Sequence, residues 1–484
     1  MSQLDRRQFL HAATVTVGGV ALAGPFSGFL ADPLSAQPSS RPAVPLGPVP
    51  DQRDGVVRLL LPAGFRYRSF HDTVTPIVLD DGTALPARHD GMAAFPARNG
   101  RVWLVRNHEV NGPGPAFGPG PPYDSMARGG TTTTLVDRFG NVDRAFTSLN
   151  GTQMNCAGGE MPWGSWITCE ETVNGPDVGA DFTTVPNTPL TQPHGFIFEV
   201  PAGGQGSREP ITDAGRFAHE AAALDPHEGV LYLTEDNFGF PSGLYRYLPR
   251  RGREHDGRIR NGGRLQMLAV QGRPNADLAA SQPRGTRYRV TWVDIDDPAP
   301  SFPYTPGQPA PTANDTAIRY VGDQGRAQGA AYFSRLEGAV FDRGTLWFTS
   351  TQGGGPPEAS TGPIADGFGN GSGQVWAYHP RSRTLRLAYE SPGPDTLDLP
   401  DNITVRRRGG ALVLCEDGGN GNYLRGLSPS GRLFDIAKNE LPGQLNDEFA
   451  GATFGPGGHT LYVNIQAGRA LTFAIWGPWQ RLGV

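Results

Sequence analysis

The chain has 484 residues, and 112 of them are Gly or Pro, which is 23 % against roughly 12 % in ordinary globular proteins. This composition excludes a helix bundle or coiled coil and predicts a turn-rich, all-β fold. The net charge of −5 predicts no general attraction to nucleic acid or anionic membranes. Lys438 is the single lysine, and three cysteines are too few for a disulfide framework.

The N-terminus reads as an export signal. Residues 5–10 are Asp-Arg-Arg-Gln-Phe-Leu, and a weakly apolar run follows from Ala12 to Leu30. A positive start before a modest apolar run is typical of a cleavable signal peptide, and the adjacent arginines resemble the twin-arginine type. We expect a signal at 1–36, a linker at 37–55 and one domain at 56–484, exported to the periplasm or beyond. A single membrane anchor is the alternative, disfavoured because the run is short and glycine-rich.

Six short apolar strands, each after a turn, recur along the rest of the chain: Val102–Val105, Trp166–Cys169, Leu231–Thr234, Leu346–Ser350, Leu412–Cys415 and Leu461–Ile465. A small-residue strand precedes each of them, and a further strand follows most of them. About six repeats of several antiparallel strands predict a six-bladed β-propeller with a long insertion at about 250–330. A pair of β-sandwiches is the alternative architecture.

A regular spacing links acidic residues of these repeats. In four repeats, 15 positions separate the residue that opens the small-residue strand from the residue that closes the next. Because the innermost strand of a blade lines the central channel, we expect one channel mouth to gather Cys156, Glu171, Glu220, Glu235, Glu337, Asp401 and Glu416. Carboxylates crowded in this way need cations. Oxygen ligands favour Ca²⁺, and a thiolate among them favours iron or zinc.

Each of these residues also has a plainer interpretation. A glutamate at a strand end is often solvated surface, and Cys156 could be an apolar filler of the core. We expect Cys169 and Cys415 to be core residues. Arg335 lies two positions before Glu337, so the two side chains share a strand face. This placement predicts either a grip on an anionic ligand or a salt bridge to Glu337.

Eight strings in order resemble the PhoX alkaline phosphatases: Asn155–Gly159, Trp163–Glu171, His194–Phe196, Gly215–Glu220, Thr234–Asp236, Leu336–Gly338, Cys415–Gly418 and Glu448–Gly451. The resemblance runs from about residue 90 to the C-terminus and includes the twin-arginine signal. It implies a short member of a family of exported six-bladed propellers that hydrolyse phosphomonoesters. The implied cofactor is a cluster of ferric iron and calcium with a bridging oxo group.

The resemblance also implies roles for individual residues. Cys156 would be the thiolate on iron, and Arg335 would bind the phosphate, with Arg335 and Glu337 as the catalytic residues. The carboxylate ligands would be Glu171, Glu235, Glu337 and Asp417, with Glu220 and Glu416 as further candidates. Either member of Glu235-Asp236 and of Glu416-Asp417 could be the ligand. The metals would act as Lewis acids and Arg335 as a bidentate clamp, without a protein nucleophile.

Two other functions stay open from the residues. One is a calcium-dependent propeller hydrolase of lactones or phosphotriesters, which needs no thiolate. The other is a non-catalytic periplasmic binding propeller, which would turn over no ester. For all three functions we expect a monomer that uses the twin-arginine export machinery, with no nucleic-acid partner and no stable membrane span.

Overall fold

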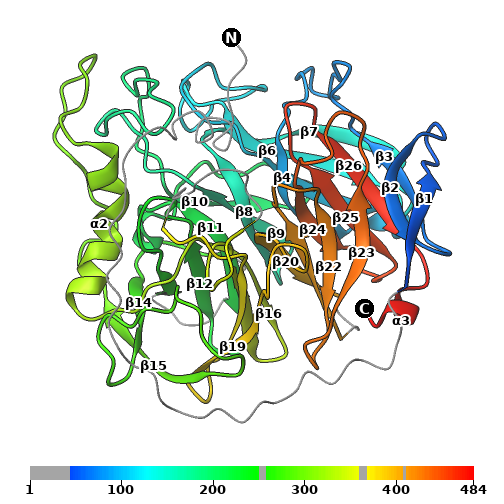
Figure 1. Ribbon diagram of the computed structural model, residues 1–484. Helices are drawn as coiled ribbons and strands as arrows, with labels where there is room; N and C mark the ends of the chain where they lie inside the picture. Colours follow the sequence, from blue (N-terminus) through cyan, green and yellow to red (C-terminus); the bar gives the residue numbers. More distant parts are fainter. Residues whose placement is uncertain (1–43, 250–257, 359–367, 407–409) are drawn as a thin grey trace.

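The computed structural model describes residues 44–249, 258–358, 368–406 and 410–484 (Figure 1). The expected signal peptide at 1–36 lies outside the described residues. Six innermost strands surround one axis: β4 (His89–Pro96), β8 (Asn155–Met161), β11 (His219–Asp225), β16 (Leu336–Asp342), β20 (Pro400–Val405) and β24 (Phe449–Phe454). Each contacts the next, and β24 contacts β4, which closes the ring. The predicted six-bladed β-propeller is therefore confirmed.

Further strands extend each blade outward by antiparallel pairing. Blade 1 adds β5 (Val102–His108), β6 (Gly129–Val136) and β7 (Val142–Thr152), and blade 2 adds β9 (Ser165–Glu170) and β10 (Ile197–Pro201). Blade 3 adds β12 (Val230–Glu235), β13 (Leu244–Leu248) and β14 (Arg264–Val270). Blade 4 adds β17 (Thr345–Ser350), β18 (Gln374–His379) and β19 (Thr384–Glu390). Blade 5 adds β21 (Leu412–Glu416), β22 (Tyr423–Leu427) and β23 (Leu433–Asn439), and blade 6 adds β25 (Thr460–Ile465) and β26 (Leu471–Trp476). The six predicted apolar strands are thus the second strands of the six blades.

The start of the described chain completes the last two blades. β3 (Arg66–Phe70) pairs with β26, β2 (Val57–Pro62) pairs with β23, and β1 (Leu46–Pro50) pairs with β2. Figure 1 shows these blue strands beside the orange and red strands of the C-terminal blades. β1 lies in the segment expected to be a linker. β1 is the edge strand of its sheet, and only one side of an edge strand forms hydrogen bonds with a neighbouring strand. Prolines, which lack an N–H donor, are therefore tolerated there.

The six blades form five hydrogen-bonded sheets rather than six. β15 (Arg287–Asp294) pairs with both β14 and β19, which joins blades 3 and 4 into one nine-stranded sheet. The segment expected as an insertion at about 250–330 therefore contains β14, β15 and the helix α2 (Asn314–Ala327), which lies along the outside of blade 3 (Figure 1). The last helix, α3 (Trp479–Leu482), buries Trp479 against Phe65 and Phe454.

Small residues allow the innermost strands to approach one another closely. A Cβ atom at Gly159 of β8 would lie 1.8 Å from the carbonyl oxygen of Ala222 on β11. One at Gly338 of β16 would lie 2.6 Å from the amide nitrogen of Ile403 on β20. These strands surround a central channel of about 280 Å³. The ring is therefore narrow, and side chains at the N-terminal ends of its strands converge above the channel.

Candidate metal centre and active site

A β-bulge interrupts every innermost strand near its N-terminal end. In five strands the pairing shifts directly after the first residue, and in β24 it shifts one residue later, after Ala450. A bulge holds one extra residue and re-aims a side chain. The residues in second place in these strands, here named the bulge residues, are Asp90, Cys156, Glu220, Glu337, Asp401 and Ala450.

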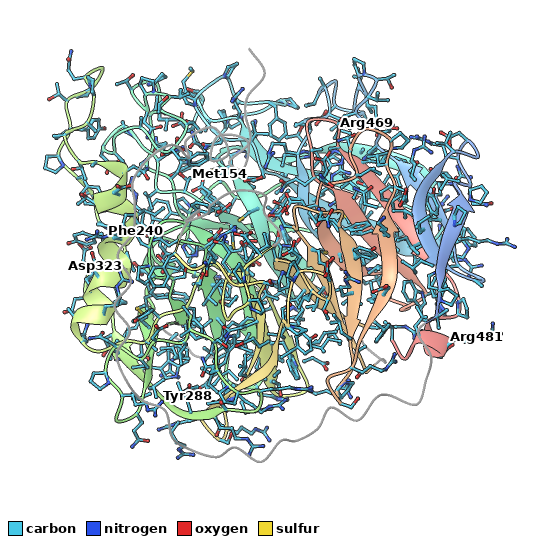
Figure 2. The ribbon with its side chains drawn as sticks, viewed as in Figure 1. Met154, Phe240, Tyr288, Asp323, Arg469 and Arg481 are labelled. Atoms are coloured by element: carbon cyan, nitrogen blue, oxygen red, sulfur yellow. The ribbon has the colours of Figure 1, made fainter. Side chains whose placement is uncertain are left out.

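A second repeated contact surrounds these residues. In every blade, the residue after the second strand donates its backbone N–H to the carbonyl of the residue just before the innermost strand, at 2.8 to 3.1 Å. The donors, here named the exit residues, are Glu109, Glu171, Asp236, Thr351, Asp417 and Gln466. The acceptors, here named the entry residues, are Arg88, Met154, Ala218, Arg335, Leu399 and Glu448. Figure 2 labels the entry residue Met154, which lies in the upper half of the view, far from Tyr288 of β15 at the lower end. We call the three sets together the hub.

The hub is strongly acidic. Its 18 positions hold nine carboxyl groups, the Cys156 thiol and the two guanidinium groups of Arg88 and Arg335. The four carboxyl groups at the bulge positions are those of Asp90, Glu220, Glu337 and Asp401. Burying so many like charges is costly unless protons or cations neutralise them.

Two sets of possible metal ligands share one residue. The ligand atoms of Cys156, Glu171 and Glu220 all lie within 4.8 Å of one another, and those of Glu220, Glu337 and Asp401 do as well. Among the described residues, the buried Oε2 of Glu220 and Oδ1 of Asp90 have no hydrogen-bond partner. A continuous group of donors with unpaired buried oxygens fits cations better than it fits a core held by hydrogen bonds.

The raised pKa values of these groups also indicate that the site needs protons or cations. Burial, followed by neighbouring carboxylates, raises the pKa of Glu220, Glu337 and Asp401 well above the usual range. Burial likewise raises the pKa of the Cys156 thiol, whose Sγ donates a hydrogen bond to the carbonyl of His219 at 3.1 Å. Without cations these groups therefore retain protons, which a metal would displace.

Arg335 is held at the edge of this acidic group. Its Nη2 donates to Asp236 Oδ2 at 2.9 Å and to Glu337 Oε1 at 2.7 Å. Its guanidinium also lies 5.1 Å from the centre of the Phe238 ring. The anticipated salt bridge to Glu337 thus exists, and the same contacts fix the orientation of the Arg335 side chain, which is only 11 % exposed.

Glu235 and Glu416, both expected at the mouth, have other partners. Glu235 Oε2 accepts hydrogen bonds from the Gly243 amide and the Tyr245 hydroxyl, at 2.8 and 2.9 Å. Glu416 accepts from Arg425 Nε at 2.8 Å and from the Tyr423 amide at 3.1 Å. Each is the last residue of a second strand and holds the third strand of its own blade. The following residues, Asp236 and Asp417, take the exit positions instead.

The reason for this shift is the length of the turn before the second strand. Residues 162–164 join β8 to β9, whereas the longer turn 226–229 joins β11 to β12. The fixed spacing of 15 therefore reaches the exit residue Glu171 in blade 2 but stops one residue short of Asp236 in blade 3. A shift of one residue turns the side chain to the opposite face.

Four hub residues were not singled out from the sequence: Arg88, Asp90, Glu109 and Glu448. The repeat contained a signal for them, because each lies at an entry, bulge or exit position defined by a small-residue strand. Cys169 and Cys415, expected in the core, are fully buried in hydrophobic clusters.

Comparison with the first of three solved structures supports the fold. Pseudomonas fluorescens PhoX in complex with vanadate, a transition state analogue, matches with a TM-score of 0.61 and 16 % identity over 90 % of this chain and 97 % of that one. The Pseudomonas aeruginosa periplasmic gluconolactonase PpgL matches with a TM-score of 0.37 and 16 % identity over 86 % and 91 %. A Xanthomonas campestris gluconolactonase matches with a TM-score of 0.35 and 14 % identity over 90 % and 99 %.

Comparison of sequences identifies the family. Among proteins with curated descriptions, none matches significantly. Within the described residues, no helix has both the length and the apolar character needed to cross a membrane. The family model for alkaline phosphatase PhoX matches residues 44–142 and 139–468, which is most of the chain. The chain therefore belongs to the PhoX family of alkaline phosphatases, and it is a phosphoric monoester hydrolase.

Proposed function

We propose that this phosphatase releases inorganic phosphate from phosphomonoesters at the hub, with a cluster of ferric iron and calcium that includes a bridging oxo group. The observation that carries the proposal is the pair of ligand sets joined by Glu220, one of which contains a thiol. A site for calcium alone would need only oxygen donors. The thiol beside carboxylates supports a transition metal as a second kind of cation.

The donor chemistry divides the hub between the two metals. Cys156, Glu171 and Glu220 would hold iron, since a thiolate favours the softer metal. Glu220, Glu337 and Asp401 would hold calcium, since all their donors are hard oxygens. Burial raises the pKa of Asp401 and of Glu448, and neighbouring carboxylates that include the exit residue Asp417 raise it further. Asp417 therefore lies close enough to assist calcium binding.

The protein's own residues then position the substrate. When bound, the metals would supply Lewis acidity toward the phosphoryl oxygens and would neutralise the carboxylates. Arg335 donates hydrogen bonds to the phosphoryl group, and its contacts with Asp236 and Glu337 fix the direction of the guanidinium. Charge builds on the equatorial oxygens in phosphoryl transfer, so a fixed guanidinium stabilises the transition state more than the ground state.

Hydrolysis of a chromogenic phosphomonoester tests this function. A calcium chelator should abolish turnover, and added calcium should restore it, because the carboxylates of the hub repel one another without cations. The substitution Glu337→Gln should weaken calcium binding at nearly constant shape. Full turnover by chelator-treated protein would contradict the proposal. Turnover of lactones or phosphotriesters in its place, by protein without iron, would support the calcium-hydrolase alternative.

We also propose export by the twin-arginine route, supported by Arg6, Arg7, Phe9 and Leu10 of the sequence. Replacing both arginines by lysine should retain the protein in the cytoplasm, as measured by cell fractionation. An unchanged periplasmic yield would contradict this route.

A further inference from the structure

The hub contains two arginines, and they occupy equivalent positions in different blades. Arg88 is the entry residue of blade 1, and Arg335 is the entry residue of blade 4. Both have left-handed backbone conformations, with φ values of 50° and 45°. Since the six innermost strands form a closed ring, blades 1 and 4 lie on opposite sides of the mouth. The two guanidinium groups therefore approach the hub from opposite directions.

The side chains of the two arginines make corresponding contacts. Arg335 Nη2 donates to Asp236, the exit residue of the preceding blade, at 2.9 Å. Arg88 Nη2 donates to Oε1 of Gln466, the exit residue of the preceding blade in the ring, at 2.7 Å. Each arginine also has a carboxylate partner in its own blade, Glu337 for Arg335 and Glu109 for Arg88. The contact with the exit residue of the preceding blade is thus equivalent for the two arginines, whereas the carboxylate partner is the bulge residue in blade 4 and the exit residue in blade 1.

The two arginines differ in charge environment and in exposure. Where Arg335 meets the carboxylate of Asp236, Arg88 meets the neutral amide of Gln466, whose Nε2 is bound in turn to Asp90 Oδ2 at 2.5 Å. The Arg88 side chain is 25 % exposed, and that of Arg335 is 11 % exposed. Arg88 therefore pairs with the carboxylate of Glu109, whereas Arg335 pairs with those of Asp236 and Glu337, and Arg88 is the more accessible of the two to an anion from solvent.

We propose that Arg88 binds a second anionic group of the substrate. The preferred substrates are then phosphomonoesters whose alcohol carries a carboxylate or a second phosphate. This inference rests on the proposed function, because Arg335 and the metals must hold the phosphoryl group that is cleaved. A guanidinium recognises either anion by charge-assisted hydrogen bonds, so the shared chemistry of the ligand is its second negative charge.

Matched substrates test this assignment. Glycerol 3-phosphate and 3-phosphoglycerate differ by one carboxylate, and fructose 6-phosphate and fructose 1,6-bisphosphate differ by one phosphate. In at least one pair, the wild type should have the higher kcat/KM for the ester that carries the second anionic group. The substitution Arg88→Gln should lower this preference by about tenfold or more, mainly through KM, because the contact exists in both ground and transition states. Arg88→Lys should retain part of the preference.

The controls separate this effect from a general change of charge or fold. Arg264→Gln removes the same charge from an arginine whose side chain is 67 % exposed on β14, and it should leave the preference unchanged. An Arg88→Gln variant that folds, hydrolyses all four esters and keeps the wild-type preference would overturn the assignment of Arg88 alone. A wild type that does not prefer the ester with the second anionic group in either pair would also overturn the assignment of Arg88. A wild type that hydrolyses none of the four esters would overturn the proposed function as well.

Discussion

Neighbouring acidic residues have different partners where the second strands of three blades end. Glu170, Glu235 and Glu416 are the last strand residues, and each accepts hydrogen bonds from backbone amides of its own blade. The next residue in each case is an acidic exit residue of the hub. The side chains of successive residues point to opposite faces, so the first acid supports the blade and the second faces the hub.

The variants Glu220→Gln and Glu235→Gln test this division. Both remove one buried carboxyl at nearly constant shape. Glu220 belongs to both ligand sets, so its variant should lose calcium affinity by about ten- to hundredfold or more. Burial raises the pKa of Glu235 to about 7, so glutamine resembles the protonated form that Glu235 already populates near neutral pH. Its variant should retain the metal, as measured by calcium titration. Equal losses in both variants would contradict the division.

The sequence indicated that acids gather at one mouth, but it did not distinguish the members of each acidic pair. That distinction depends on the number of turn residues in each hairpin, which a fixed spacing cannot include. Asp90 and Glu448 were missed for a related reason. The bulge and exit residues are 19 positions apart in blade 1 (90 and 109), against 14 to 16 in blades 2 to 5, and blade 6 has Ala450 at the bulge position, so neither blade repeats the pattern of the other four.

At the scale of the strand, the bulges and the small residues determine how tightly the hub closes. Short apolar runs after turns predicted the second strands well, because those strands lie inside the blades. The bulges leave no comparable trace in the sequence. They arise where the pairing of two strands shifts in register by one residue, and they turn the second residue of each innermost strand toward the axis.

The substitution Gly159→Ala tests the close approach of β8 and β11. The added Cβ would lie 1.8 Å from the Ala222 carbonyl oxygen, so backbone must move. The free energy of unfolding in urea should fall by about 1–3 kcal/mol. The control Gly468→Ala adds the same atom at an exposed position where nothing lies within 4 Å, and it should change stability by less than about 0.5 kcal/mol. Equal effects of the two substitutions on the free energy of unfolding would contradict the close approach of β8 and β11.

At the scale of the whole molecule, the ring is closed by strands from both ends of the described chain. β3 completes blade 6, and β15 fastens blade 3 to blade 4. The sequence predicted the number of blades because the repeat is regular. It did not predict these two connections, because they pair strands that lie far apart in the chain or outside the repeat.

The acidic hub at the mouth of the ring couples stability to pH and, through the proposed calcium site, to calcium. The raised pKa values of Glu220, Glu337 and Asp401 mean that the folded, cation-free protein binds protons that the unfolded chain releases. The stability from these protons is complete below the ordinary carboxyl pKa of about 4.3 and is lost as pH rises toward the raised values. Calcium at the proposed site would displace these protons, so we expect its binding to strengthen as pH rises.

The increase in melting temperature on adding calcium should therefore grow between pH 6 and pH 8. Burial lowers the pKa of His194, but the carboxylates of Glu170 and Asp124 outweigh it and raise that pKa to about 9. The stabilisation from the protonated imidazole is therefore lost between about pH 6.5 and pH 9. That loss occurs with and without calcium, so it cancels in the difference between the two melting temperatures. A calcium-induced increase that is independent of pH would contradict the proton displacement.

Elemental analysis of the protein exported by its own signal, compared with the Cys156→Ser variant, tests the central claim most directly. We predict both iron and calcium in the wild type, with a visible absorption band from ferric thiolate. Serine is a harder and much less acidic ligand, so the variant should lose the band and most of the iron while its circular dichroism stays unchanged. Cys169→Ser, which alters a buried core residue, should retain the iron. A colourless wild type that holds only calcium, or a Cys156→Ser variant with its full iron content, would contradict the iron–calcium centre.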